Sequence, residues 1–203
     1  MMKSSPPPQA AAFDECVPAL LASTLRTLRD DLKFSRMTPV QSAVIPLFLS
    51  NKDVAVEACT GSGKTVAFLV PIVEILMRRD VDARAGVGAV VISPTRELAR
   101  QTFKVASLFC ADAAATAIGL KCTLLIGGTS AKADALKLKD SSIIVATPGR
   151  LADVLERHSG GSLHIADLEV LVLDEADVLL SMGFHHTLME VRFFARVEKI
   201  FRG

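Results

Sequence analysis

Eight consecutive residues combine glycines with a lysine and a threonine, a composition suited to binding phosphate: Ala58, Cys59, Thr60, Gly61, Ser62, Gly63, Lys64 and Thr65. They follow a short apolar run and precede a helical pattern, which is the setting of a phosphate-binding loop. Gly61 and Gly63 let the backbone curl so that its N–H groups converge on phosphate oxygens. We expect Lys64 to reach the β- and γ-phosphates and the Thr65 hydroxyl to ligate Mg²⁺. Since Ala58 replaces the glycine of the general pattern, the alternative is a glycine-rich turn without a ligand.

Two acids, Asp174 and Glu175, follow directly after the apolar run Val170–Leu173. Parallel strands end at the same edge of a sheet, so we expect these acids to lie beside the phosphate loop. Holding two acids at the tip of an apolar strand is costly without a cation, and Mg²⁺ would supply one. Asp174 would then hold Mg²⁺ through water, and Glu175 would orient or deprotonate the attacking water. The alternative is a helix N-cap with solvated acids.

Both motifs depend on elements that bring them to one sheet edge. Short apolar runs alternate with helical patterns, which indicates a parallel α/β sheet covered on both faces. The predicted strands are Val54–Glu57, Gly88–Ile92, Cys122–Ile126, Ile143–Ala146 and Val170–Leu173. The predicted helices are Val17–Leu32, Pro39–Leu49, Lys64–Arg79, Arg96–Cys110, Ala131–Leu138, Gly149–Arg157 and Phe184–Val197. Surface loops are predicted at Asp80–Val87 and Ser159–Ser162.

Composition favours one intracellular domain with an aliphatic core. Half of the 203 residues are hydrophobic, but only 5% are aromatic, and Trp and Tyr are absent. The net charge of +1 gives no global basic field, so any nucleic-acid binding must come from a local surface. The four cysteines lack Cys-x-x-Cys spacing, which favours reduced thiols over a zinc site. No apolar run is long enough for a membrane span or a signal peptide, so neither a membrane protein nor a secreted one is expected.

Together with Ala176 and Asp177, the acid pair spells Asp-Glu-Ala-Asp, and the chain resembles the DEAD-box RNA helicases over about Phe13–Phe184. The phosphate loop has that family's Ala-x-Thr-Gly-Ser-Gly-Lys-Thr form. Further segments match the family's motifs in the family's order: Phe34, Thr38-Pro39-Val40-Gln41, Pro94-Thr95-Arg96-Glu97-Leu98-Ala99, Gly127-Gly128 and Thr147-Pro148-Gly149-Arg150. The resemblance implies a single RecA-like lobe, a P-loop NTPase with a parallel sheet flanked by helices, at residues 13–190. A disordered leader (1–12) would precede it and a tail (191–203), truncated or shifted from the family pattern, would follow.

The resemblance also implies ATP and Mg²⁺ as cofactors, RNA as a partner, and a role for each motif. The implied ATP-binding residues are Phe34, Gln41, Thr60, Gly61, Ser62, Gly63, Lys64 and Thr65. Lys64, Asp174 and Glu175 would be catalytic, Thr65 and Asp174 would hold Mg²⁺, and Asp177 would couple hydrolysis to unwinding. The implied RNA-binding residues are Pro94, Thr95, Arg96, Gly127, Gly128, Thr147, Gly149 and Arg150.

Physical chemistry agrees with these roles. An amide such as that of Gln41 can pair with the donor and the acceptor of adenine together, and Phe34 can stack on the base. The alternatives are a core position for Phe34 and a solvated helix position for Gln41. Arg96 and Arg150 follow strands closely, so they share a sheet edge and could grip successive phosphates without reading base sequence. Arg100 and Arg157 are instead expected in solvated surface pairs.

Some residues depart from the family pattern. Lys33 precedes Phe34 where glycine is usual, and Val178 and Ser181 stand where relatives often carry Arg and Asp. Residues 191–202 alternate apolar and basic side chains, so a basic amphipathic helix is the alternative to a truncated end. The arginines of the family's second lobe, which stabilise the transferring phosphoryl group, have no counterpart before Gly203. We therefore expect the isolated chain to bind ATP·Mg²⁺ and RNA weakly and to unwind nothing.

Three function hypotheses follow. The leading one is an ATP-dependent RNA helicase. The residues within its motifs resemble those of nucleolar helicases of large-subunit ribosome assembly, which implies pre-ribosomal particles as partners. The second is a non-catalytic regulator that holds ATP, RNA or a partner helicase through the same surface. The third is a DNA-directed ATPase or a nucleotide kinase, although no lid-like arginine cluster supports a kinase.

Overall fold

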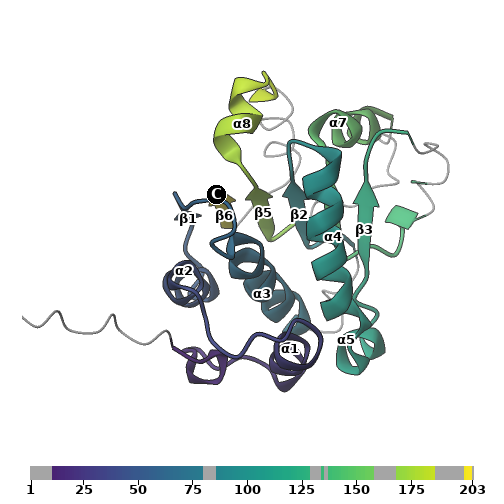
Figure 1. Cartoon of the computed structure of the whole chain (residues 1–203). Helices are drawn as coiled ribbons and strands as arrows, with labels where there is room; N and C mark the ends of the chain where they lie inside the picture. Colours follow the sequence, from purple (N-terminus) through teal and green to yellow (C-terminus); the bar gives the residue numbers. More distant parts are fainter. Residues whose placement is uncertain are drawn as a thin grey trace, which may run out of the picture.

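The computed structural model describes residues 11–79, 86–128, 134, 137–157, 168–185 and 199–202, with residues 157 and 199–202 described by their backbone alone. Helices and strands alternate along the chain (Figure 1). The helices are a 3-10 turn at Phe13–Glu15, α1 (Ala22–Arg26), a π-turn at Thr27–Asp31, α2 (Pro39–Leu49), α3 (Lys64–Met77), α4 (Arg96–Ala111), α5 (Ala113–Ala117), α7 (Pro148–Arg157) and α8 (Ala176–Ser181). The strands are β1 (Val54–Ala55), β2 (Ala89–Ile92), β3 (Cys122–Leu125), β4 (Ile143–Ala146), β5 (Val170–Leu173) and β6 (Lys199–Arg202).

The six strands form one sheet in the order β1-β6-β5-β2-β4-β3, and all pairs are parallel. The central strand β2 pairs with both β4 and β5, so that Ile92 lies level with Ala146 on one side and with Leu173 on the other. Parallel pairing places the carboxyl ends of all strands along one edge, where the connections to the following helices begin. This edge positions the motifs of the sequence.

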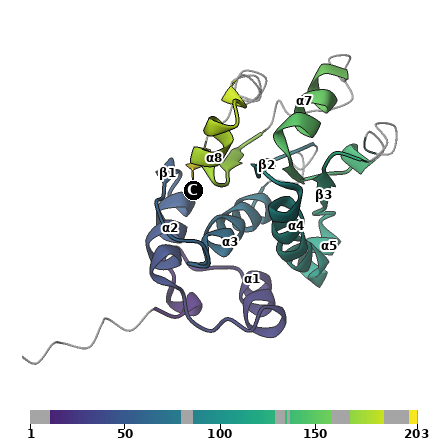
Figure 2. The same ribbon diagram turned by 45° about the horizontal axis from the view of Figure 1, so that its top comes forward.

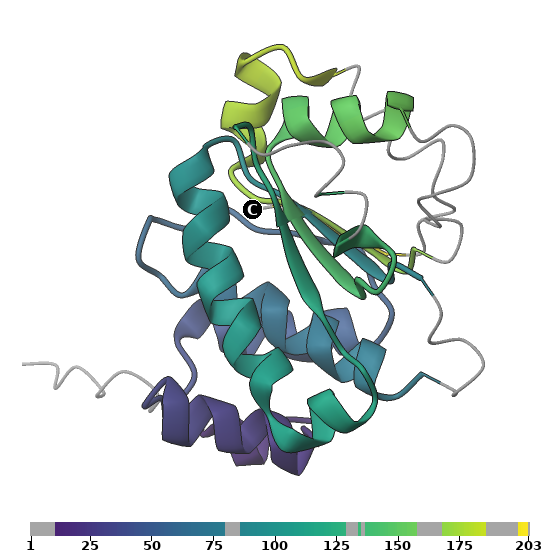
Figure 3. The same cartoon turned by 90° about the vertical axis from the view of Figure 1, so that its right-hand side faces the viewer.

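Alternate residues of the strands enter two separate hydrophobic cores. Val91 and Val145 pack with α2, α3 and α4 on one face of the sheet, whereas Ile92 and Ala146 pack with α7 and α8 on the other. Side chains of a strand alternate between the two faces, so a strand covered on both sides is apolar throughout. All four residues of β2 and of β4 are buried accordingly. Figure 3, which views the sheet from its β3 edge, shows α4 and α7 on opposite sides of it.

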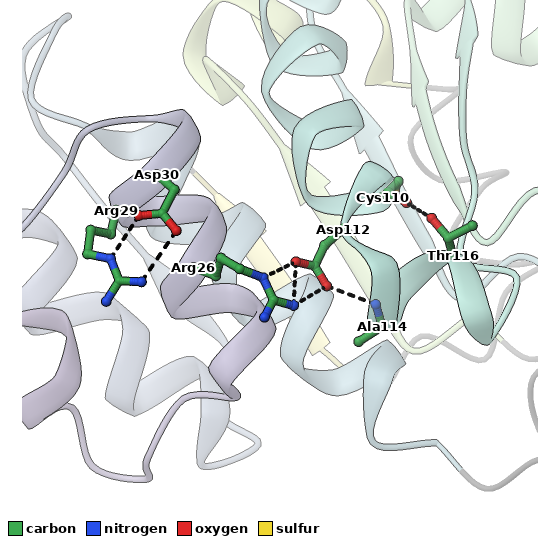
Figure 4. A network of polar contacts seen from close by, with 7 residues as sticks. All are labelled: Arg26, Arg29, Asp30, Cys110, Asp112, Ala114 and Thr116. Carbon is green, nitrogen blue, oxygen red and sulfur yellow. Dashed lines mark hydrogen bonds and ion pairs between the residues drawn. The ribbon is translucent and has the colours of Figure 1, made fainter.

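The N-terminal helix α1 lies beside α3 and the α4–α5 corner (Figure 2). Arg26 of α1 donates from Nε and Nη2 to the carboxylate of Asp112 at 2.8 and 2.9 Å (Figure 4). Asp112 also accepts a hydrogen bond from the Ala114 N–H at 2.9 Å, which caps α5. One carboxylate therefore joins the N-terminal helix to the corner between α4 and α5.

Five of the six observed strands lie where the sequence predicts them, and the bounds of β4, β5 and α2 agree with the prediction. The sixth is a correction, because the sequence predicts a tail after residue 190, whereas the backbone of Lys199–Arg202 forms β6 between β1 and β5. The sequence also does not predict the short helices α5 and α8. Of the predicted helix Phe184–Val197 and the two predicted loops, all or most residues lie outside the described part. Of Ala131–Leu138, the described residues Asp134, Lys137 and Leu138 are helical.

The predicted helix Val17–Leu32 begins later than expected, at Ala22. Two side chains of α3 explain the difference. The Leu21 N–H donates to Glu74 Oε1 at 2.8 Å, and Arg78 Nη2 donates to the Ala19 carbonyl at 2.7 Å. These long-range bonds satisfy the backbone of residues 19–21 in an extended form, in place of helical bonds. Within the described residues, no helix is both long and apolar enough to span a bilayer.

Candidate functional site

Four loops leave the carboxyl edge of the sheet at the same level. Backbone bonds continue the ladder by one residue past the strands, from Asp174 N to Ile92 O (2.9 Å), from Ser93 N to Ala146 O (2.9 Å) and from Thr147 N to Leu125 O (3.0 Å). The acid pair after β5 and the RNA-type motifs predicted after β2, β3 and β4 therefore form one continuous rim. The phosphate loop, which follows β1, adjoins this rim at the acid pair.

The phosphate loop is built on two glycines in the left-handed region. Gly61 has φ +79° and Gly63 has φ +93°, conformations that favour glycine, and α3 begins at the next residue, Lys64. The Lys64 ammonium donates to the carbonyl oxygen of Ala58 and to that of Cys59 (3.4 Å). A positive side chain and a helix N-terminus thus point into the same curl of backbone, which suits a bound phosphate.

The segment predicted to recognise adenine packs directly on this loop. Thr38 caps α2, and Gln41 completes the capping box by accepting from the Thr38 N–H at 2.8 Å. The Gln41 amide nitrogen then donates to the Gly63 carbonyl at 3.2 Å. Because Gln41 is only 3% exposed, its alternative interpretation as a solvated helix residue is wrong. Its amide keeps a second N–H and a second acceptor lone pair, which remain for pairing with a base.

Phe34 lies at the mouth of the site. Its side chain is 44% exposed, so the alternative interpretation as a core residue is wrong. The preceding residue, Lys33, has φ +60°, a left-handed conformation that explains why glycine suits this position. An exposed aromatic ring at a cavity mouth offers a flat apolar surface on which a base can stack.

Asp174 is a buried acid with an unusual affinity for protons. Its relative exposure is 7%, and the Ser93 hydroxyl donates to its Oδ2 at 3.4 Å. Desolvation, together with the neighbouring Glu175 charge, raises the pKa of Asp174 to about 6, against the lowering effect of Lys64. Glu175 has φ +50° and turns the chain into α8. A carboxylate destabilised in this way favours the arrival of a cation.

One cavity of about 510 Å³ gathers these parts, and we call it the central cavity. It is lined by Leu32, Phe34, Arg36, Thr38, Gln41, Thr60, Gly61, Ser62, Gly63, Lys64, Thr65, Val66, Leu98, Gln101, Val105, Asp174 and Glu175. The expectation that Lys64 and Asp174 meet at one sheet edge is thereby confirmed. A volume of this size is typical of small-ligand sites, and its lining changes from aromatic and apolar to basic and acidic.

The donors in the central cavity fit Mg²⁺. The Thr65 hydroxyl and the Asp174 carboxylate both line it, and oxygen donors of this kind suit that ion. In the described part of the chain, no three His, Cys, Asp or Glu side chains cluster as an all-protein metal site. This composition matches an ion that keeps several waters and is shared with substrate phosphates.

The rim after β2 and β3 is open to solvent. Thr95 is exposed and caps α4 by accepting from the Leu98 N–H at 3.2 Å, whereas Pro94 is buried. The exposed Arg96 reaches across to the next loop, because a Cβ at Gly127 would lie 2.8 Å from its Nη2. At Gly128, with φ +99°, and at Gly149, an added Cβ would meet no atom within 4 Å. Both glycines are exposed, so their backbones are open to solvent.

Arg150 differs from Arg96. It shares the predicted rim, but its guanidinium is buried and bonded to Asp134, with Nε and Nη2 at 2.9 and 2.7 Å from Oδ2. Because these carboxylate bonds hold the guanidinium inside, Arg150 does not project from the rim as the exposed Arg96 does. Arg100 agrees with the sequence, as it is exposed and lies 3.9 Å from Glu97.

Asp177 lies beside the central cavity and outside it. It lines a neighbouring cavity of about 670 Å³, which shares Thr60, Lys64 and Glu175 with the central cavity. The Asp177 side chain is exposed, and no hydrogen bond or ion pair to it is found among the described residues. Asp177 therefore lies next to the end of the central cavity that is lined by Lys64 and Glu175.

Sequence reasoning missed several residues of the site. Ser93, which reaches Asp174, and Leu32, Gln101 and Val105, which line the central cavity, carry no motif of their own, and Leu98 belongs to a motif without an expected role in the site. Gln101 and Val105 could have been found only from the helical spacing of α4, because residues one turn apart share a face. Asp134 could not be found, since its partner follows a different strand.

A family model described as "DEAD/DEAH box helicase" matches residues 38–200 of the chain. The chain is 50% identical over 182 residues to the ATP-dependent RNA helicase DDX55 of Gallus gallus, covering 87% of this chain and 30% of that protein. It is 47% identical over 182 residues to DEAD-box ATP-dependent RNA helicase 18 of Oryza sativa subsp. japonica, covering 88% and 27%. The chain thus spans about a third of the length of these curated relatives.

Solved structures of DEAD-box proteins are also similar to this chain in fold. Mss116p bound to ssRNA and AMP-PNP superimposes with a TM-score of 0.84 at 29% identity, covering 100% of this chain and 42% of that one. A DEAD box protein from Methanococcus jannaschii superimposes with a TM-score of 0.79 at 30% identity, covering 95% and 49%. The RecA-like fold expected from the sequence is confirmed.

Proposed function

Because this chain belongs to the DEAD/DEAH box helicase family, we propose that it is the ATP-binding lobe of an ATP-dependent RNA helicase. The central cavity is the single observation that carries this proposal. It joins a stacking ring, a base-facing amide, a phosphate loop and two acids in one space of nucleotide size.

The residues then divide the work on ATP. Phe34 stacks on adenine while Gln41 pairs with its edge, and the backbone from Thr60 to Gly63 receives the phosphates. Lys64 exchanges its loop carbonyls for phosphate oxygens, and its charge offsets the charge that develops on the transferred group. Thr65 and Asp174 hold Mg²⁺, which neutralises phosphate charge when bound, and Glu175 orients the attacking water.

RNA would lie along the rim formed after β2, β3 and β4. Arg96, the Thr95 and Thr147 hydroxyls, and the N–H groups of Gly128 and Gly149 are suited to phosphate oxygens. Contacts of this kind carry no base readout, so binding is independent of sequence. Mss116p, a structural relative of this chain, was solved with ssRNA and AMP-PNP bound.

Unwinding requires more than these residues. The relatives are about three times as long as the matched region, and the arginines that stabilise the transferring phosphoryl group belong to the family's second lobe. We therefore propose that the 203 residues alone bind ATP·Mg²⁺ and RNA without separating strands. The residues within the motifs favour a role in ribosome assembly in the nucleolus, on pre-ribosomal particles.

ATP turnover with and without RNA tests the proposal. Lys64→Ala and Glu175→Gln should each reduce RNA-stimulated turnover by about 10²-fold or more, because each removes charge stabilisation or water activation. Lys52→Ala and Glu97→Gln change the same residue types at exposed positions outside the central cavity, and should have no effect. RNA binding without any turnover in the unmutated chain would instead support a non-catalytic regulator. Preference for a matched DNA strand over RNA would support a DNA-directed ATPase.

A further inference from the structure

A buried ion pair joins two loops of the proposed RNA rim. Arg150, near the start of α7, donates from Nε and Nη2 to the same oxygen of Asp134, at 2.9 and 2.7 Å. The two side chains are 8% and 0% exposed. The third nitrogen, Nη1, lies 3.6 Å from Asp153, whose side chain is 53% exposed. The arginine is thus held mainly by an acid that has no contact with solvent.

The two residues of the pair belong to the connections that follow two neighbouring strands. Asp134 comes shortly after Gly127 and Gly128, in the connection that leaves β3, and Arg150 comes directly after Thr147 and Gly149, in the connection that leaves β4. β3 and β4 are neighbours in register, with Leu125 level with Ala146. The pair therefore joins the connections that follow two adjacent strands, and each connection carries an exposed glycine.

Burial makes the ion pair between Asp134 and Arg150 rigid. A carboxylate without solvent contact is stable only when it is paired, and loss of either partner leaves an uncompensated charge. The arginine fork also fixes direction, because Nε and Nη2 point the same way from one planar group. In contrast, Gly128 and Gly149 are exposed, and a Cβ added at either would meet no atom within 4 Å. The rim thus combines a buried ion pair with two exposed glycines.

We propose that Asp134 and Arg150 are positioning residues for RNA, which set the spacing of the Gly128 and Gly149 N–H groups, and that the Arg150 guanidinium does not contact the RNA. This inference rests on the proposed RNA-binding function. It differs from a direct phosphate contact in a measurable way. Losing a phosphate contact lowers the slope of log affinity against log salt by about one, whereas misplacing the rim lowers affinity at an unchanged slope.

The experiment measures binding of a single-stranded oligouridine to the 203-residue chain by fluorescence anisotropy at several KCl concentrations. Asp134→Asn should weaken binding about tenfold with an unchanged salt slope, because the tie between the loops is lost. If Arg150 contacts phosphate, the same change frees the guanidinium, so binding becomes tighter and the slope steeper. That result would overturn the proposal. Asp153→Asn is the matched control, since it neutralises the half-exposed partner of the same arginine, and should stay within about twofold.

Two further measurements keep the test decisive. Thermal unfolding and affinity for a fluorescent ADP analogue are recorded for each variant, and ADP affinity should not change. Should Asp134→Asn not fold, Arg150→Lys replaces it: a direct phosphate contact tolerates lysine, whereas the fork to Asp134 does not, so weaker RNA binding supports positioning. Absence of RNA binding by the unmutated chain overturns the proposed function and this inference together. Unmutated binding that Asp134→Asn leaves unaltered overturns this inference alone.

Discussion

The side-chain amide of Gln41 donates a hydrogen bond to the carbonyl oxygen of Gly63 at 3.2 Å. This contact joins the segment proposed to recognise adenine to the last residue of the phosphate loop. The second N–H and the second lone pair of the same amide are left for a base. One side chain can therefore contact the base and the phosphate loop together.

Alanine at Gly63 should be more damaging than alanine at Gly61. Both residues have positive φ, but a Cβ at Gly63 would lie 2.5 Å from Gln41 Nε2, whereas one at Gly61 would meet nothing within 4 Å. Gly61→Ala then costs only backbone strain, about 1 kcal/mol in the free energy of unfolding, and Gly63→Ala costs about 1–3 kcal/mol more. Urea denaturation of both variants measures the difference. Equal losses would contradict the contact between Gln41 and the loop.

Glycine at position 33 should stabilise the protein. Lys33 has φ +60°, so Lys33→Gly relieves left-handed strain and raises the free energy of unfolding by about 0.5–1 kcal/mol. Lys52→Gly is the matched control, because Lys52 is also exposed but is not among the residues with positive φ. The control should be neutral or destabilising. Thermal melts of the two variants check the prediction, and a lower melting temperature for Lys33→Gly would refute it.

The raised pKa of Asp174 predicts a specific dependence of stability on pH. The carboxyl binds its proton more tightly in the folded state, with a pKa of about 6 against 3.8, so its contribution to stability falls as pH rises through this window. Asp174→Asn mimics the protonated form. Without nucleotide, it should raise the free energy of unfolding by roughly 2–3 kcal/mol at pH 8 and change it little near pH 4.

Denaturant titrations at the two pH values test this, with Asp177→Asn as the control. Asp177 is an exposed acid three residues further along the chain, so its amide variant should change the free energy of unfolding at pH 8 less than Asp174→Asn does. A stabilisation by Asp174→Asn that is equal at both pH values would show that burial does not set the proton affinity of Asp174.

The Arg26–Asp112 contact should carry a measurable but modest share of stability. Arg26→Ala removes a two-pronged but half-exposed ion pair and should cost about 0.5–1 kcal/mol. Asp112→Ala should cost about 1–2 kcal/mol, because the cap on the Ala114 N–H is lost as well. Arg29→Ala, which breaks an exposed pair with the adjacent Asp30, is the control and should be nearly neutral (Figure 4). Chemical denaturation ranks the three variants, and a larger loss for Arg29→Ala than for Arg26→Ala would contradict the prediction.

The sequence was most informative where local chemistry alone decides structure. A phosphate loop is predicted by Gly61, Gly63 and Lys64, because few residue types other than glycine tolerate its left-handed backbone. The runs that became β4 and β5 were bounded correctly because an apolar strand between two helical layers has no polar position. Pro39 after Thr38 marked the start of α2 for a similar reason, since that pair forms a favourable N-terminus.

Long-range contacts decided the features that the sequence did not reveal. The start of α1 depends on Glu74 and Arg78 of another helix, and the burial of Arg150 depends on Asp134. β6 was missed because a short strand with basic flanks has no distinctive pattern until its neighbours are known. In each case the deciding partner is distant in sequence, so periodicity in one window cannot report it.

The place of β6 in the sheet has a consequence for biosynthesis. Within the described sheet, β1 pairs only with β6, which is the last strand along the chain and inserts between β1 and β5. While the polypeptide is still emerging from the ribosome, the strand that leads into Gly61 and Lys64 has no neighbour to hold it. Formation of the nucleotide site should therefore await synthesis of Lys199–Arg202, whose backbone β1 needs as a neighbour.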